Sequence, residues 1–420
     1  MKKNTIVFGL QFGDEGKGRM TDYFARQVDN PLVVRFNGGA QAAHNVVTPE
    51  GLHHTFQQFG AGTLAGARTL LSQYMLVDPI RLATEATELT HKLKRWVLTD
   101  HYVHCAAPVL TPYHGALNRI KERARGDQRH GSCGNGVGEL MADLTGGVHG
   151  RPVLRMGELK HRTLLYEKLC EIQRRCQADA RPYWDGQENT PEFKILMDHP
   201  HDTEVAMWSI GKELNIRTHA ECRELVYTSN CVFEGAQGML LDQDRGFAPH
   251  NTWSKCGPDN ALALLKDAGV QDEPEIVGVM RSYMTRHGAG PLPSEGLVPT
   301  SWFPAEHNQT NDWQQHWRTG ALDMTLLWHA LQYVPLRTTI ALTHMDLPPD
   351  VIRLPAVDTP SAAYSDAGML RYVTGQLPTN QTRTSLVAPS DLQHFIWGIT
   401  QRRVKYITRG PTHTTTEVCA

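Results

Sequence analysis

The stretch Ile6-Val7-Phe8-Gly9-Leu10-Gln11-Phe12-Gly13-Asp14-Glu15-Gly16-Lys17-Gly18 is a short apolar run followed directly by a glycine-rich turn. The run predicts a buried strand, and the recurrence of apolar side chains after it predicts a helix over residues 17–28. This order would turn backbone N–H groups and a helix N-terminus toward one anion, and Lys17 would add a positive charge. The stretch therefore predicts a phosphate-binding turn within an α/β fold.

The turn differs from the two best-known phosphate-binding motifs. A Walker A motif carries Ser or Thr after its lysine to hold magnesium, whereas Gly18 follows Lys17 here, and the G-x-G-x-x-G spacing is not met either. A metal ligand must therefore come from another residue, and Asp14 is the candidate. The same letters also fit a plain strand-to-helix turn whose glycines serve geometry alone.

The bulk properties describe an ordinary globular chain. It has 420 residues, 40% hydrophobic and 20% charged, with a formal net charge of −2, which removes the electrostatic case for nucleic-acid binding. No apolar run approaches the ~20 residues that span a membrane, and the N-terminal apolar stretch is too short for a signal peptide. The eight cysteines form no C-x-x-C pair, so we expect neither zinc nor a disulfide framework, and a cytoplasmic location.

Strand-like and helix-like segments alternate along the chain. Asp78-Pro79 is a typical helix start, with an N-cap aspartate and a proline at the first helical position. The remaining polar, proline-bearing stretches, such as 177–194, suggest surface excursions. We expect strands over 6–10, 31–36, 231–233, 275–280, 338–343 and 404–408, and helices over 17–28, 79–93, 260–268, 321–331 and 392–400. The alternation predicts a mostly parallel central sheet with flanking helices, P-loop NTPase-like, in a single domain spanning 1–420.

Five further segments combine small residues with one or two polar groups, and several directly follow a predicted strand. Each alone fits an ordinary loop, but six such segments in one chain, counting the first turn, favour a shared ligand site at the strand ends. The five are Asn37–His44, Gly131–Gly138, Glu234–Gly238 with Pro249–Thr252, Thr285–Pro291 and Trp317–Gly320.

In their order and spacing these motifs resemble the adenylosuccinate synthetase family, over residues 5 to about 415. The motifs that carry the resemblance are Gly-Asp-Glu-Gly-Lys-Gly, the Asn-Gly-Gly…His segment, Phe-Glu-Gly-Ala-Gln-Gly, Gly-Ala-Gly-Pro-Leu-Pro and Arg-Thr-Gly-Ala-Leu-Asp. The resemblance implies a C–N ligase that joins L-aspartate to C6 of a 6-oxopurine nucleotide, driven by a nucleoside triphosphate, through a 6-phosphoryl intermediate.

The resemblance also implies roles for individual residues. Asp14 would be the general base for the purine N1 proton and, with the carbonyl of Ala43, a ligand of Mg²⁺. His44 would donate to the transferred phosphoryl group, and Lys17 and Gln237 would complete the catalytic set.

The resemblance further implies two nucleotide-binding sites, one for the triphosphate and one for the monophosphate. Arg151 would come from the neighbouring subunit, which implies a homodimer. The triphosphate site would consist of Gly13, Glu15, Gly16, Lys17, Gly18, Arg19, His344, Asp346, Thr408 and Gly410, and the monophosphate site of Gln41, Cys133, Arg151, Gln237 and Thr252.

The sequence departs from the family pattern in its recognition loops. The family's aspartate loop reads Thr-Thr-Gly followed by several arginines, whereas here Thr310, Gln315 and Arg318 remain as donors for a dicarboxylate. The loop that reads the base of the triphosphate usually carries Lys-x-Asp but is His344-Met345-Asp346 here, which makes ATP a plausible donor. Cys133 stands where a threonine contacts the monophosphate.

These departures leave the phosphoryl-transfer motifs intact, which suggests the same reaction on shifted substrates. A phage-type branch of the family acts on dGMP, with ATP or dATP, to make N6-succino-2-amino-2'-deoxyadenylate, and the segments 10–12 and 37–41 are similar to that branch. Many members of that branch replace the catalytic aspartate, which is present here as Asp14. We expect dGMP with ATP or dATP, with IMP and GTP as the alternative. A nucleotide-binding regulator without ligase activity and a P-loop kinase are further alternatives.

Overall fold

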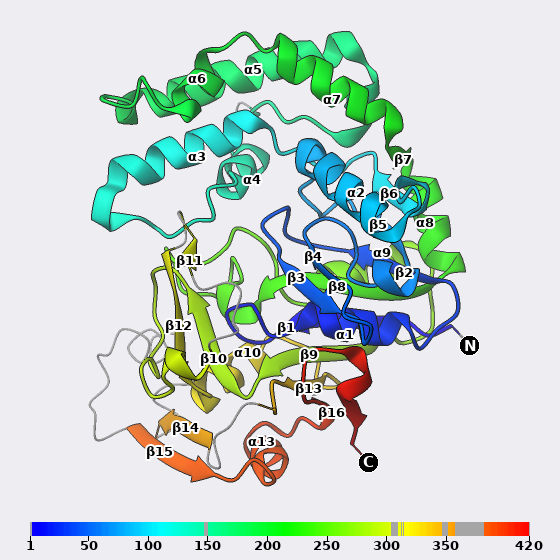
Figure 1. Cartoon of the computed structure of the whole chain (residues 1–420), viewed down its shortest axis with the longest axis vertical. Coiled ribbons are helices and arrows are strands. Elements are labelled where there is room, and N and C mark those ends of the chain that lie inside the picture. The colour runs from blue at the N-terminus through cyan, green and yellow to red at the C-terminus, as the bar shows by residue number, and fades with distance from the viewer. Residues whose placement is uncertain are drawn as a thin grey trace.

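A ten-stranded sheet forms the centre of the molecule (Figure 1). The computed structural model describes residues 2–146, 150–303, 310–311, 313, 315–346, 352–357 and 382–419. All neighbouring strands run parallel except β16 and β17, so the mostly parallel α/β fold that the alternation predicted is confirmed. The order is β17 (Thr416–Val418), β16 (Val404–Thr408), β13 (Thr339–Thr343), β9 (Glu275–Arg281), β1 (Thr5–Gly9), β8 (Asn230–Gly238), β2 (Pro31–Arg35), β5 (Arg68–Leu71), β6 (His101–His104) and β7 (Asn215–Arg217).

Strand β1 lies in the middle of the sheet, and both of its faces are covered. Ile6 and Phe8 pack with one core cluster and Val7 with another, as the alternation of side chains along a strand requires. Helix α1 (Lys17–Ala25) contributes to the Val7 side. The Ile6 and Phe8 side is covered by α8 (His219–Thr228), α9 (Asp259–Asp267), α10 (Met324–Leu331) and α13 (Leu392–Thr400).

A helical layer lies beyond the β5–β6 end of the sheet, at the top of Figure 1. Apolar side chains from five of its helices form a separate cluster that also includes Leu71 and Val103 from the sheet, and those of a sixth helix lie in a smaller cluster beside it. The stretch 177–194 belongs to this layer, and its prediction as a surface excursion was partly wrong: Gln177–Ala180 is the last turn of one helix and Pro191 begins another. The layer contains α2 (Pro79–Leu93), α3 (Pro112–Arg125), α4 (Val137–Thr145), α5 (Arg162–Ala180), α6 (Pro191–Met197) and α7 (His201–Glu213).

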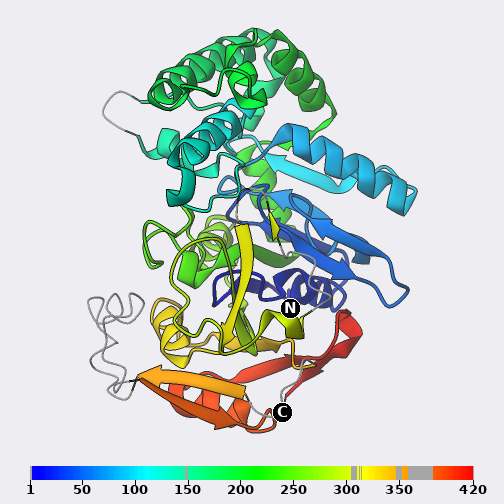
Figure 2. The same ribbon diagram turned by 60° about the vertical axis from the view of Figure 1, so that its left-hand side comes forward.

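Three smaller sheets are present among the described residues besides the central one. Figure 2 shows the longest of their strands, β12 (Gln315–Ala321, yellow), beside the central sheet, between the helical layer and the C-terminal strands. They are the hairpin β3 (His44–Val47) with β4 (His53–Phe56), the sheet of β10 (Tyr283–His287), β12 (Gln315–Ala321) and β11 (Thr310–Asn311), and the pair β14 (Ile352–Val357) with β15 (Thr382–Val387). Within the described ranges no helix is both long and apolar enough to cross a membrane.

The predicted elements are confirmed in type and order, with differences at their ends. Asp78 caps α2 as expected, accepting from the backbone N–H groups of Ile80 and Arg81. The predicted helix over 321–331 begins later, at Met324, because Ala321 ends β12 and Asp323 provides the N-cap. The predicted helix over 17–28 ends at Ala25.

A buried histidine in the sheet predicts a pH dependence of stability. Burial lowers the pKa of His101 to about 4, whereas an unfolded histidine titrates near 6.5. As the pH falls from 6.5 to 4 the unfolded chain gains this proton before the folded one does, so folding loses up to about 1.4 kcal/mol per pH unit from this group. Urea unfolding at pH 4.5 and 7 should therefore show a smaller loss in His101→Leu than in the wild type.

The exposed His91 on α2 provides the control for this experiment. His91→Leu should retain the wild-type pH dependence. Equal pH dependence in the wild type and His101→Leu would contradict the assignment.

Candidate functional site

The glycine-rich turn after β1 is built on left-handed backbone conformations. Gly13, Asp14 and Gly16 have φ values of 93°, 57° and 91°, and Gly16 is the N-cap of α1. Gly18 lies so close to the hairpin that a Cβ there would be 2.8 Å from the Cβ of His44. The turn and His44 are therefore neighbours, as the predicted site required.

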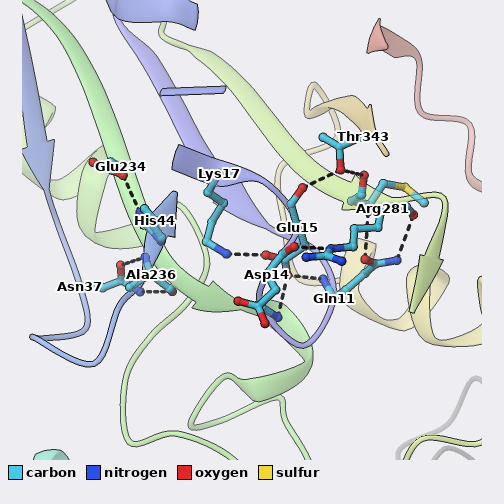
Figure 3. Close-up of polar contacts among 12 residues, drawn as sticks. Gln11, Asp14, Glu15, Lys17, Asn37, His44, Glu234, Ala236, Arg281 and Thr343 are labelled. Atoms are coloured by element: carbon cyan, nitrogen blue, oxygen red, sulfur yellow. Dashed lines mark hydrogen bonds and ion pairs between the residues drawn. The ribbon is translucent and has the colours of Figure 1, made fainter. Parts of the chain in front are cut away.

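The buried carboxylate of Glu15 holds the turn in shape from within. One of its oxygens accepts from the backbone N–H groups of Gln11, at 3.1 Å, and Gly13, at 2.9 Å. The other forms an ion pair with Lys17, and the carbonyl of Glu15 accepts from the hydroxyl of Thr343 at 2.7 Å (Figure 3). The side chain of Glu15 therefore serves the turn itself, which leaves its backbone N–H for the predicted triphosphate contact.

Asp14 lies on the open side of the turn. Its Oδ2 is 2.8 Å from Nε2 of His287, and its carbonyl accepts from the guanidinium of Arg281. Burial alone would raise the pKa of Asp14, but the hydrogen bond and charge of His287 and the charges of Arg281 and Lys17 outweigh it, and the pKa lies below its usual value. The carboxylate is therefore ionised at neutral pH, which is the form that a general base requires.

His44 forms a buried pair with Glu234 of β8, shown in Figure 3. Its Nδ1 is 2.5 Å from Oε1 of Glu234, whose other oxygen accepts from the backbone N–H of Ala61 at 2.9 Å. Burial lowers the pKa of His44, and the charges of Arg35 and Lys17 add to this effect, whereas Glu234 opposes it. A negatively charged phosphoryl group beside the ring would also favour the protonated form, in which Nε2 can donate.

The ends of β13 and β16 bring the predicted base-reading residues together. The backbone N–H of Met345 donates to the carbonyl of Thr408 at 3.0 Å. The guanidinium of Arg19 donates to the carbonyl of Gly410, and burial lowers its pKa to about 10 against the opposing charge of Asp346. Two segments that are about sixty residues apart in the sequence, 344–346 and 408–410, thus meet beside α1.

His344 sits in this cluster with a φ of 58°. Its Nδ1 is 2.8 Å from the hydroxyl of Thr343, the same hydroxyl that donates to the turn at Glu15. Burial lowers the pKa of His344 well below its usual value, and the charges of Arg281 and Arg19 act in the same direction, so the ring is neutral at pH 7.

Only some of the residues predicted to bind the monophosphate lie close to one another in the structure. Gln41 follows two glycines: a Cβ at Gly38 would lie 2.6 Å from the Cβ of Ala236, and a Cβ at Gly39 would lie 2.9 Å from Oε1 of Gln41. This Oε1 is buried and has no hydrogen-bond partner among the described residues. Asn37 ties this loop to β8 through two hydrogen bonds with the backbone of Ala236, at 2.7 and 3.0 Å (Figure 3). Gln237 follows Ala236 with a φ of 64°.

Of the other monophosphate candidates, Thr252 is tied to the segment after β8 by a backbone hydrogen bond of 2.8 Å to Leu241. Burial raises the pKa of the Cys133 thiol, which remains a weak hydrogen-bonding group. Arg151 is not brought to the turn: it pairs with Asp143 and Asp179 in the helical layer, at 3.5 and 3.2 Å.

The predicted aspartate residues belong to the β10–β12–β11 sheet. Thr310 and Gln315 lie on β11 and β12, and their side chains lie outside the described residues. Arg318 is described: it pairs with Glu295 at 2.7 Å and donates to the carbonyl of Gly290 at 2.9 Å. A dicarboxylate would have to compete with Glu295 for this guanidinium.

The donor set fits a magnesium ion. Mg²⁺ prefers hard oxygen ligands and commonly takes one or two from the protein and the rest from phosphates and water. An ionised Asp14 and the carbonyl of the exposed Ala43, on the loop that leads to His44, supply ligands of this kind. Among the described residues no cluster of three or more His, Cys, Asp or Glu side chains could hold a metal.

Sequence reasoning gave no role to four residues that the site uses. They are His287 beside Asp14, Glu234 beside His44, Arg281 at the Asp14 carbonyl and Thr343 at the Glu15 carbonyl. His287 and Glu234 lie inside motifs that the sequence singled out, but their partners are 273 and 190 residues away, and no local pattern shows such pairs.

Comparisons with known proteins agree on one family. The adenylosuccinate synthetase family model matches residues 6–359. The adenylosuccinate synthetase of Halothermothrix orenii is 31% identical over 356 residues, covering 82% of this chain and 77% of the relative. That of Chlorobium chlorochromatii is 29% identical over 360 residues, covering 82% and 76%.

Two solved structures share the fold. The fully ligated adenylosuccinate synthetase from Plasmodium falciparum matches with a TM-score of 0.79 at 18% identity, covering 100% of both chains. The cyanophage S-2L succinoaminodeoxyadenylate synthetase, bound to dGMP and to dATP as an energy donor, matches with a TM-score of 0.62 at 17% identity, covering 100% of this chain and 95% of that one.

The internal role of Glu15 can be tested by removing its charge. Glu15→Gln leaves Lys17 as an uncompensated buried cation, so we expect a loss of roughly 3–5 kcal/mol in the free energy of unfolding, measured by urea denaturation. The exposed Glu188→Gln is the matched control and should change stability by less than about 0.5 kcal/mol. A Glu15→Gln protein as stable as the control would show that the pair does not hold the turn.

Proposed function

Because this chain belongs to the adenylosuccinate synthetase family and is a ligase of the adenylosuccinate synthase type, we propose that its site joins L-aspartate to C6 of a 6-oxopurine nucleoside monophosphate at the expense of a nucleoside triphosphate. The observation that supports this proposal best is the cluster of Asp14, Lys17 and His44 around one turn, with the charges of Asp14 and His44 both influenced by Lys17.

Each of these residues would have a distinct task in the proposed reaction. The ionised Asp14 would take the proton from purine N1, which makes the 6-oxygen nucleophilic toward the γ-phosphoryl group. Lys17 and the N–H groups of the turn would hold the triphosphate, and His44, oriented by Glu234, would donate to the transferred group. Mg²⁺, held by Asp14 and Ala43, would neutralise phosphate charge. The amine of aspartate would then displace phosphate from C6.

For the substrate pair we propose dGMP with ATP or dATP. Support comes from the base-reading loop, where the neutral His344 replaces the lysine of the family pattern, and from the altered aspartate loop around Arg318. The shared fold with the cyanophage enzyme, which binds dGMP and dATP, is compatible with this pair.

IMP with GTP is the second candidate. It is favoured by the retention of Asp14, by the names of the curated relatives at 29–31% identity, and by the higher TM-score of the Plasmodium falciparum enzyme. Asp346 would then accept from guanine.

We further propose a homodimer in which Arg151 reaches the monophosphate of the neighbouring subunit. Its side chain is 41% exposed, and its ion-pair partners Asp143 and Asp179 lie in the helical layer rather than at the turn. Sedimentation would give the oligomeric state. Mixing Arg151→Ala with Asp14→Ala should then restore activity, since one of the two shared sites in a hybrid dimer would be intact.

The proposed ligase reaction is tested first at Asp14. Asp14→Ala should lower kcat for succinyl-nucleotide formation by at least about 10²-fold, the usual contribution of a general base. Circular dichroism should show an unchanged fold. Product is scored by mass, and phosphate release should require both aspartate and a monophosphate. Turnover of Asp14→Ala at the wild-type rate would remove the base role from this residue.

The substrate pair is tested by a matrix of IMP, GMP, dIMP and dGMP against ATP, dATP and GTP, each with aspartate. We expect the highest kcat/KM for dGMP with ATP or dATP. His344→Lys should shift the GTP/ATP ratio of kcat/KM toward GTP by about tenfold, or 1.4 kcal/mol. His91→Lys on α2 is the control for an added lysine. An unchanged ratio in His344→Lys would show that this loop does not read the base.

A further inference from the structure

We propose that His287 is a positioning residue for the reaction: it holds Oδ2 of Asp14, so that Oδ1 is the oxygen presented to the purine N1 proton. This inference rests on the proposed function, because it assumes that Asp14 is the base. It adds a residue that the family motifs gave no role, and it assigns separate tasks to the two oxygens of the carboxylate.

His287 is placed by a strand rather than by a mobile loop. It is the last residue of β10, where it pairs in register with Trp317 of β12. The two side chains remain partly open to solvent, 18% exposed for His287 and 25% for Asp14, so a substrate can reach them. The contact therefore joins the rim of a small sheet to the turn after β1.

The direction of this hydrogen bond follows from the charge of Asp14. An ionised carboxylate only accepts, so the 2.8 Å contact requires that Nε2 of His287 carries the hydrogen and donates to Oδ2. No hydrogen bond among the described residues engages Oδ1 of Asp14. Oδ1 therefore has a lone pair for a new N–H donor, and the carboxylate keeps further lone pairs for the Mg²⁺ ion that Asp14 would also hold.

In the part of the chain that the structure describes, the hydrogen bond from Arg281 to Asp14 and the ion pair of Lys17 do not reach this carboxylate. Arg281 donates to the carbonyl of Asp14, not to its side chain, and Lys17 pairs with Glu15. The left-handed backbone at Asp14 fixes the direction of its Cβ but leaves rotation about the side-chain bonds open. Of the described side chains, His287 is thus the one whose hydrogen bond favours one rotamer of Asp14 before Mg²⁺ and the substrate bind.

The reaction makes orientation important. Proton transfer from N1 needs the accepting oxygen within hydrogen-bond reach of that nitrogen, and a misplacement of about 1 Å can cost 10²-fold in rate. A free Asp14 could also rotate toward the positive charge of Lys17 or Arg281. Loss of His287 should then slow the chemical step without weakening the binding of the triphosphate, which the turn and Lys17 hold.

The test compares two substitutions with a matched control. His287→Val removes the donor and should lower kcat by about 10- to 100-fold, while KM for the triphosphate stays within about twofold of the wild type. His287→Gln retains an N–H donor on a side chain of similar reach and should recover kcat to within about fivefold. His91→Val, on the exposed surface of α2, should leave both constants unchanged.

The outcomes separate this inference from the proposed function when Asp14→Asn is measured in parallel. If Asp14→Asn is inactive while His287→Val keeps the wild-type kcat, or if His287→Gln is as slow as His287→Val, the positioning role is overturned and the base role stands. If Asp14→Asn turns over normally, the base role itself fails. Thermal melting of every variant identifies a loss of fold, and the Gln variant then decides the question.

Discussion

The site depends on one buried carboxylate. Glu15 is fully enclosed, and a charge in such a place is stable only when its oxygens are paired and hydrogen-bonded. It meets this condition by gathering the N–H groups of Gln11 and Gly13 and the ammonium of Lys17. The geometry of the turn is thus the geometry that satisfies Glu15. Gly9, where a Cβ would collide with that carboxylate, is part of the same constraint.

The parallel sheet then brings distant segments to this turn. β1 lies between β8 and β9. Arg281, the last residue of β9, reaches the turn itself, and Glu234, in the middle of β8, reaches His44 beside the turn. β13, the next strand after β9, supplies Thr343, whose hydroxyl donates to the carbonyl of Glu15. Strand order explains why residues more than two hundred positions apart act on one turn.

Local patterns in the sequence predicted the fold because apolar periodicity and helix caps depend on residues that are close together in the sequence. Apolar periodicity located the strands and helices, and Asp78-Pro79 located a helix start to the residue. These local patterns could not predict contacts between distant elements, such as the hydrogen bond of Asp14 with His287 or the ion pair of Arg318 with Glu295. The helix predicted from 321 began at Met324 for the same reason, since the pairing of Ala321 with Tyr283 extends β12 across the predicted start. Arg151 likewise pairs within the helical layer through partners that no spacing reveals.

Backbone strain marks the site independently of any motif. Among the described residues six that are not glycine have a left-handed backbone, and three of them are Asp14, Gln237 and His344. Of the others, Lys94 and Gln401 end helices, where this conformation is common. The three site residues end no helix: His344 directly follows β13, Gln237 is the next-to-last residue of β8, and Asp14 lies in the turn between β1 and α1. Such conformations cost of order 1–3 kcal/mol and persist only where the surroundings over-determine them. Hydrogen bonds hold the backbone at each of these three positions. Arg281 donates to the carbonyl of Asp14, and Ser282 donates to the carbonyl of His344. Asn37 accepts from the backbone N–H of Ala236, just before Gln237. The three residues that we propose as the base, a monophosphate contact and a base reader therefore share a backbone conformation that contacts from other segments of the chain hold in place.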